Sequence, residues 1–193
     1  MELIAFTITP NNRKVVAFIK HFDLPVEVRQ VDFKRQEHKG EEFTKLNPMQ
    51  KVPVLVDGDF VLWESNAILT YLAGKFPETD TLPSDLEGRA DVDRWLHWQS
   101  AHLMPMMGAV KTGDKTEEDV KPLFGVLNGQ LAGKEYITGK LTVADFAVAA
   151  YTLTSNADKF DFSDYPDLAA WRDRMGGMPA FEETAFKLPP AAA

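Results

Sequence analysis

The chain has 193 residues, of which 45% are hydrophobic and 26% are charged, and its formal net charge is −8. This is the composition of an ordinary soluble globular protein, long enough for one large or two small domains. The acidic balance argues against a nucleic-acid partner, which requires a basic face. The chain contains no cysteine, which excludes disulfides, thiolate metal sites and a cysteine nucleophile. Any thiol chemistry must therefore use a thiol that arrives with a ligand.

The hydropathy of the chain gives no sign of a membrane protein. No run of about 18 apolar residues occurs, so we expect no membrane span. The first residues, Met1-Glu2-Leu3-Ile4, lack the basic start and long apolar stretch of a signal peptide. We therefore expect a cytoplasmic location, and the lack of cysteine fits a reducing compartment.

The first 76 residues predict a mixture of strands and helices. The apolar run 2–8 predicts a buried strand, apolar positions at helical spacing predict a helix over 12–22, and alternation predicts a strand over 26–31. A strand, a helix and a second strand predict a parallel, right-handed crossover. The remaining predicted elements are a short helix at 41–46, strands at 54–56 and 60–62 around the turn signal at 57–59, and a helix at 65–76.

The second half of the chain predicts only helices. Residues 77–85 are rich in proline, threonine and aspartate and are interpreted as a linker. The predicted helices that follow cover 86–104, 116–131, 146–153 and 166–175, with a last turn opening at Pro179. Thr142 and Asp145 have the spacing of a capping box at the start of a helix. The predicted division is therefore an α/β domain over 1–78 and an all-helical domain over 86–193.

Two short stretches, 47–55 and 63–69, carry the most chemical information. A proline at the start of a strand has no N–H for the ladder, so Val52-Pro53 predicts a turn and is a candidate cis bond. A cis bond would leave the N–H and C=O of Val52 free to pair with a peptide-like ligand. Glu64-Ser65 opens a predicted helix, whose N-terminal N–H groups favour a carboxylate. Together these features predict a clamp for a small peptide.

These residues resemble the glutathione-binding half of the cytosolic glutathione transferases, of the bacterial type similar to the theta, phi and nu classes. The resemblance extends in order and spacing to three further blocks, 9–15, 36–39 and 141–146. It implies a thioredoxin-like α/β N-terminal domain followed by an all-α C-terminal domain. It also implies glutathione as co-substrate and a homodimer in which the N-terminal domain of one subunit packs against the helical domain of the other.

Thr9 and Asn11 are the candidate catalytic residues. By the resemblance, Thr9 stands where several transferase classes carry a serine, and its hydroxyl would donate a hydrogen bond that lowers the pKa of the glutathione thiol. Thr9 and Asn11 together are similar to a pair that approaches the ligand sulfur in nu-like members, and an asparagine NH₂ can donate to a thiolate or to a disulfide sulfur. The alternatives are that Thr9 only caps the following helix and that Asn11 only occupies a turn.

Three basic residues are candidates for the carboxylate of the glycine end of glutathione. His38 and Lys39 match a pair that contacts this carboxylate in phi-like transferases, and Lys51 could serve the same group. A cation there suits an anionic tripeptide. The alternative for His38 and Lys39 is an ordinary solvated loop.

The remaining candidate glutathione-binding residues come from the two informative stretches. Val52, shaped by Pro53, would pair through its backbone with the cysteinyl part of the ligand. Glu64 would hold the ammonium of the γ-glutamyl end, and Ser65 would hold its carboxylate. The alternatives are that Pro53 only shapes the strand entry and that Ser65 is a plain helix cap.

An aromatic and methionine-rich zone follows the predicted linker. Trp98, His102 and Met106 in this zone are candidates for a hydrophobic second-substrate pocket, since methionine adapts to variable shapes. Ordinary helix core is the alternative. The chain has no HExxH motif, cysteine pair or aspartate cluster, so no metal site is predicted.

The function that the resemblance implies is that of a glutathione transferase. The glutathione thiolate would attack an electrophilic substrate held against the helical domain. Two alternatives remain open: a glutathione-dependent disulfide reductase, and a glutathione-binding or scaffold module without catalysis.

Overall fold

A computed structural model describes residues 1–185; residues 186–193, at the end of the predicted helical domain, lie outside this description. Its sheet has four strands, β1 (Glu2–Ala5), β2 (Glu27–Gln30), β3 (Val54–Asp57) and β4 (Phe60–Trp63), in the order β2-β1-β3-β4. β1 and β2 are parallel, and the other two pairs are antiparallel. The predicted parallel crossover is confirmed.

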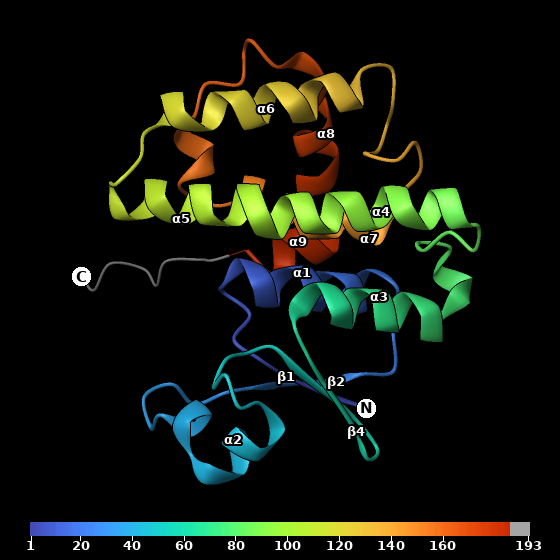
Figure 1. Ribbon diagram of the computed structural model, residues 1–193, viewed down its shortest axis with the longest axis vertical. Coiled ribbons are helices and arrows are strands. Elements are labelled where there is room, and N and C mark those ends of the chain that lie inside the picture. The colour runs from blue at the N-terminus through green and yellow to red at the C-terminus, as the bar shows by residue number, and fades with distance from the viewer. Residues whose placement is uncertain (186–193) are drawn as a thin grey trace.

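Helices cover both faces of this sheet. Along β1, Leu3 and Ala5 belong to a core cluster with α1 (Pro10–His21) and α3 (Ser65–Lys75), whereas Ile4 packs in a second cluster with Phe43 of α2 (Glu41–Leu46). Successive strand residues point to opposite faces, which produces this alternation. Accordingly, α1 and α3 lie between the sheet and the rest of the molecule, and α2 lies apart from them (Figure 1).

From residue 77 to residue 185 the described elements are all helical, as predicted. Short 3₁₀ turns occupy Pro77–Thr79 and Ala157–Lys159 in this part of the chain, and a further one occupies Glu37–Lys39 in the N-terminal half. The longer helices are α4 (Leu86–Trp98), α5 (Met104–Thr112), α6 (Glu117–Leu131), α7 (Val143–Thr152), α8 (Pro166–Gly176) and α9 (Pro179–Glu183). Within residues 1–185, no helix is both long and apolar enough to cross a membrane.

The helix predicted over 86–104 continues further than the sequence indicated. α4 leads into a π turn, Gln99–Leu103, and then directly into α5, which ends at Thr112. Pro105 lacks an N–H and its ring collides with the carbonyl four residues earlier in a regular α-helix. The wider π turn is consistent with that clash, because it removes the regular four-residue spacing just before the proline.

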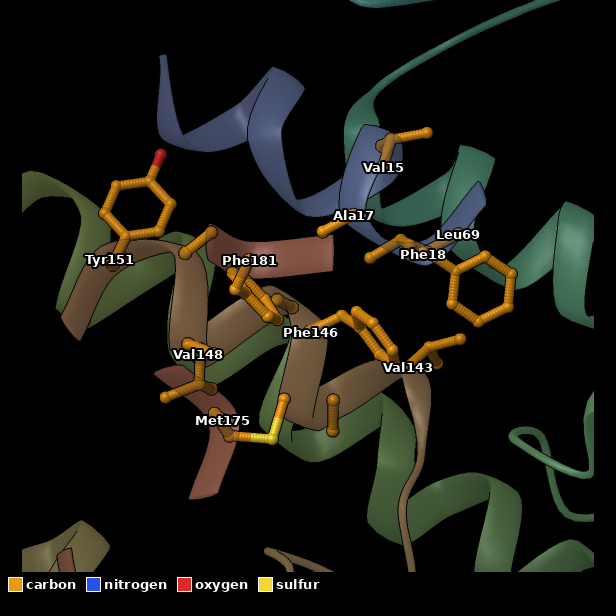
Figure 2. Close-up of a cluster of buried hydrophobic side chains, with 14 of the residues drawn as sticks. Val15, Ala17, Phe18, Leu69, Val143, Phe146, Val148, Tyr151, Met175 and Phe181 are labelled. Atoms are coloured by element: carbon orange, nitrogen blue, oxygen red, sulfur yellow. The ribbon is translucent and has the colours of Figure 1, made fainter. Parts of the chain in front are cut away.

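One hydrophobic core joins the two halves of the chain. Its cluster runs from Leu3 of β1 to Phe181 of α9, and α1 packs against α7 at its centre. There Phe18 meets Phe146 edge to face, with ring centroids 5.2 Å apart, and Phe181 stacks on Phe146 (Figure 2). The predicted capping box of Thr142 and Asp145 is present at the start of α7. The division at residues 78 and 86 stays a prediction.

Candidate functional site

The start of α1 places Thr9 at the N-cap position. Its side chain makes no capping bond to the helix. Instead, its hydroxyl donates to the carbonyl of Phe6 at 3.2 Å and accepts a hydrogen bond from Asn12 Nδ2 at 2.6 Å. The proton of Thr9 is therefore engaged, and it would have to leave Phe6 in order to reach a ligand sulfur.

Asn12 connects the two loops that carry the candidate site. It is 2% exposed. Its Oδ1 accepts from the amide of Phe6 at 3.0 Å, and its Nδ2 reaches both Thr9 and the carbonyl of Val52, the latter at 3.3 Å. The Val52 carbonyl is thus partly engaged within the protein. Sequence reasoning missed Asn12, and the available signal was a second amide side chain in the first turn of a helix, directly after Asn11.

Asn11, in contrast, is oriented by the helical half of the chain. The hydroxyl of Tyr151 on α7 donates to Asn11 Oδ1 at 2.9 Å, and Asn11 Nδ2 donates to the thioether sulfur of Met104 on α5 at 3.7 Å. Burial raises the pKa of Tyr151, so its hydroxyl remains a proton donor at neutral pH. The Tyr151 hydroxyl therefore orients the Asn11 amide so that its NH₂ group, the donor end, faces the Met104 sulfur.

The loop between α2 and β3 is held by its own asparagine. Asn47 Nδ2 donates to the carbonyl of Lys51 at 2.7 Å, and Asn47 Oδ1 accepts from the amide of Met49 at 2.9 Å. The Val52–Pro53 peptide bond is cis, as the motif indicated. The side chain of Lys51 is exposed, so its charge is accessible to an anion.

The start of α3 has an unusual backbone. Glu64, the N-cap residue, has φ +72° and ψ 110°, a region that few residues other than glycine adopt and that is enriched at functional sites. Its side chain is exposed, whereas Ser65 is 6% exposed. No hydrogen bond within residues 1–185 uses the Ser65 hydroxyl. The first turn of α3 therefore combines open N–H groups, a hydroxyl and a carboxylate.

The other predicted glutathione-binding residues lie near the sheet edge at β2. His38 packs on Phe33 with ring centroids 4.4 Å apart, and Phe33 packs on Phe6 at 4.7 Å. Phe6 joins this aromatic group to the loop that precedes α1. Lys39 is exposed. The binding roles of His38 and Lys39 stay predictions.

The predicted second-substrate residues are divided between two helices and the π turn. Trp98, at the end of α4, packs edge to face on Trp95 at 5.1 Å, His102 is exposed, and Met106 is half-buried. The methionine that contacts a predicted catalytic residue is Met104, which the sequence placed in the same zone but not among the site residues. The roles of Trp98, His102 and Met106 stay predictions.

Comparison with known proteins agrees with this arrangement. Residues 1–74 match the family described as "Glutathione S-transferase, N-terminal domain" and residues 97–179 match "Glutathione S-transferase, C-terminal domain". The chain is 34% identical to glutathione S-transferase theta-1 of Bos taurus, with 91% of this chain and 82% of that protein covered.

Two solved structures are similar over nearly the whole chain. An epsilon-class glutathione S-transferase from the housefly, Musca domestica, superposes with a TM-score of 0.84 at 27% identity, with 95% of this chain and 91% of that chain covered. A glutathione transferase family member from Pseudomonas fluorescens, solved with two glutathione bound, gives 0.81 at 28% identity, with 95% and 91% covered. This chain therefore belongs to the glutathione S-transferase family.

Proposed function

We propose that this chain binds glutathione across the loops that Asn12 joins, with the γ-glutamyl end at the start of α3. The proposal is supported by the open first turn of α3, where the helix dipole and the Ser65 hydroxyl favour a carboxylate. The exposed carboxylate of Glu64 suits the ammonium of the same end. The backbone of Val52 and Pro53 takes the cysteinyl part, and His38, Lys39 and Lys51 provide cations for the glycine carboxylate.

Asn11 is the residue that we assign to the glutathione sulfur. The observation that carries this proposal is the fixed orientation of its amide, held by Tyr151 with its NH₂ group toward the Met104 sulfur. A hydrogen bond donated to a thiolate favours the charged form and lowers the thiol pKa. Thr9 contributes a second donor only when its hydroxyl turns from Phe6.

The reaction is the transfer of glutathione to an electrophile. The thiol loses its proton to solvent, the thiolate sulfur forms a bond to the electrophilic carbon, and the leaving group departs with its electron pair. Trp98, His102 and Met106 hold the hydrophobic electrophile beside α1. Catalysis then comes from the lowered thiol pKa and from holding two reactants together.

Titration of the bound thiol tests the assignment. The ultraviolet absorbance of the thiolate is followed against pH in wild type, Asn11→Ala and Thr9→Ala, each saturated with glutathione. We expect Asn11→Ala to raise the pKa of the bound thiol by about one unit and Thr9→Ala to raise it less. Equal pKa values in all three proteins would remove both residues from the chemistry, and calorimetry that finds no glutathione binding to wild type would overturn the whole proposal.

A glutathione-dependent disulfide reductase is the second candidate, favoured by the donor geometry of Asn11. The Pseudomonas fluorescens relative was solved with two glutathione bound, and an amide donor serves a disulfide sulfur as well as a thiolate. In this reaction the thiolate of a bound glutathione attacks the glutathionyl sulfur of a mixed disulfide, the S–S bond breaks, the substrate sulfur departs as a thiolate that takes up a proton, and oxidised glutathione is formed. Comparing turnover of a mixed disulfide with that of a chlorinated aromatic separates the candidates. Binding without turnover of either substrate would indicate a non-catalytic module.

The chain is further proposed to form a homodimer in the cytoplasm. β4 is an edge strand of the sheet, and Phe60 on it is 47% exposed, with Trp63 and Met49 also exposed. On the helical side, Leu86 at the start of α4 is 85% exposed. Apolar side chains on both halves fit a second copy that packs its helical domain, residues 86–193, against the N-terminal domain, residues 1–78.

A further inference from the structure

Lys14 on α1 is an almost completely buried lysine, with 1% of its surface exposed. Its Nζ donates to Asn66 Oδ1 at 2.6 Å and to Gln99 Oε1 at 3.0 Å. Lys14, Asn66 and Gln99 form what we call the buried polar cluster, between α1, the first turn of α3 and the π turn. An ammonium in such a position is rare, because removing a charge from water is costly unless the charge is paired.

The compensation of this charge within the protein is incomplete. Both acceptors are neutral amide oxygens, and Gln99 Oε1 is shared with Asn66 Nδ2 at 3.1 Å. Within residues 1–185 no carboxylate forms an ion pair with Lys14, and the third ammonium proton has no acceptor. The Nε2 of Gln99 is likewise buried without a partner among the described residues. The cluster therefore contains a cation but no anion.

Glu64 is the charged group that acts on Lys14. Burial lowers the pKa of Lys14 to about 7, and the negative charge of Glu64 opposes this shift. Most other titratable groups on the packed elements are directed elsewhere: Arg13 binds the carbonyls of Leu153 and Phe181, Lys20 pairs with Glu183, Lys75 pairs with Asp57, and His102 is exposed. The Tyr151 hydroxyl, which donates to Asn11, also interacts with Gln99, but burial raises the pKa of Tyr151 and keeps it neutral, so it brings no charge to the cluster.

The position of the buried polar cluster relates it to the proposed γ-glutamyl site. Asn66 directly follows Ser65, and its side chain is fixed between Lys14 and the carbonyl of Leu96, to which Nδ2 donates at 2.9 Å. The Lys14 ammonium is therefore bonded to the first turn of α3, the turn whose N–H groups are open to a ligand. A carboxylate at Ser65 would place a full negative charge close to this cation in a site of low dielectric.

We propose that Lys14 is a positioning residue for the γ-glutamyl carboxylate of glutathione, and that binding of this carboxylate is coupled to uptake of a proton by the Lys14 side chain. The carboxylate supplies the negative charge that the buried polar cluster lacks. This inference rests on the proposed function, because it takes the γ-glutamyl end to bind at Ser65.

The coupling follows from thermodynamic linkage between binding of the γ-glutamyl carboxylate and binding of a proton to Lys14. A nearby negative charge favours the protonated form of a lysine and raises its pKa. The free protein therefore holds a partly neutral Lys14 near neutral pH, and the complex holds a protonated one. By reciprocity the affinity for the carboxylate decreases as the pH rises and Lys14 loses its proton.

Isothermal titration calorimetry with S-methylglutathione tests the coupling, because this ligand has no thiol proton to release. The titration is made at about pH 7 in buffers that differ in ionisation enthalpy. The dependence of the observed enthalpy on that quantity gives the number of protons taken up, for which we expect about 0.5 per site in wild type. Binding without any uptake would overturn the role of Lys14 and leave the proposed function standing; absence of binding would overturn both.

Substitutions of two lysines on α1 test whether Lys14 is the group that takes up the proton. Lys14→Met removes the titrating group and should abolish the uptake, whereas Lys20→Met, the same substitution at an exposed position of α1, should retain it. Lys14→Arg keeps a permanent positive charge and should also lose the uptake, which preserves the test if the methionine variant does not fold. Uptake in either Lys14 variant equal to that of wild type would overturn the inference.

Discussion

At the residue scale, the two adjacent asparagines of α1 have opposite surroundings. Asn12 is buried and uses both ends of its amide within the N-terminal half, whereas Asn11 faces α5 and α7. Sequence reasoning selected Asn11 through its place in a motif and overlooked Asn12. The two are chemically identical in the sequence, and only the direction in which α1 packs distinguishes the residue that connects the N-terminal loops from the one that faces the helical half.

The orientation of Asn11 leads to a prediction for Tyr151. Tyr151→Phe removes the donor that holds Asn11 Oδ1, so the amide can rotate and offer its oxygen to the sulfur. We expect the pKa of bound glutathione to rise by about half a unit or more and kcat/KM to fall about tenfold, with little change in glutathione affinity. Tyr165→Phe is the matched control, since the Tyr165 hydroxyl donates to the carbonyl of Lys121 at 3.4 Å and makes no hydrogen bond to the candidate site among residues 1–185. A bound thiol with an unaltered pKa in Tyr151→Phe would contradict the assignment.

Lys14 also predicts how stability depends on pH in the ligand-free protein. Its pKa in the folded state is lowered to about 7 from 10.5, so above pH 7 the unfolded chain binds more protons than the folded one. The free energy of unfolding of wild type, relative to that of Lys14→Met, should therefore rise with pH by at most about 1.4 kcal/mol per unit. Urea denaturation of both proteins between about pH 6 and pH 9 measures this difference. Parallel curves across that range would contradict a strongly perturbed lysine.

At the element scale, the segment from α4 to α5 shows where local rules were insufficient. The periodicity of 86–104 predicted a helix over those residues, yet the chain passes through a π turn and continues as α5 to Thr112. That turn contains Gln99 and ends beside Met104, the residues that reach Lys14 and Asn11. The sequence predicted the helix from its own pattern, whereas the continuation depends on packing against α1 and α7.

Two capping boxes of the same chemistry permit a matched prediction about helix starts. Asp145 at α7 is buried and accepts hydrogen bonds from Thr142, Ile137 and Trp171, whereas Asp119 at α6 is 34% exposed and accepts from Thr116 and Lys115. Asp145→Ala strands buried donors and should lower the free energy of unfolding by about 3 kcal/mol or more. Asp119→Ala should cost about 1 kcal/mol. If chemical denaturation showed the same loss in free energy of unfolding for both variants, burial of Asp145 would add nothing to the stability that its capping box provides.

At the scale of the whole molecule, the fold class was predictable and the joining of the two halves was not. The strand at β2, its parallel crossover from β1 and the α7 capping box were predicted from short stretches of sequence, and all three are confirmed. Arg13, which the motif reading left without a role, donates to the carbonyls of Leu153 and Phe181. Those partners lie about 140 and 170 positions away in the chain, and no local pattern specifies such contacts.

The proposed homodimer gives a prediction at the same scale. Phe60→Lys puts a charge on the exposed edge strand and should shift the protein from dimer to monomer, because desolvating a lysine at an interface is unfavourable. Val126→Lys makes the same change at another exposed apolar residue, on α6, and should leave the dimer intact. Sedimentation velocity of wild type and both variants measures the effect. A monomeric wild type would contradict the proposal.

The continuous core has a consequence for recombining this protein with its relatives. α1 lies between two strands in the sequence but packs against α7 in the structure. Side chains on the face of α1 that points away from the sheet, such as Phe18, therefore pack directly on α7 side chains such as Phe146. A chimaera that exchanges the helical half at the linker would bring together two surfaces that were never fitted to one another. A transplant that respects the packing would carry α1 residues along with α7, so the natural unit of exchange is a pair of facing helices rather than a length of chain.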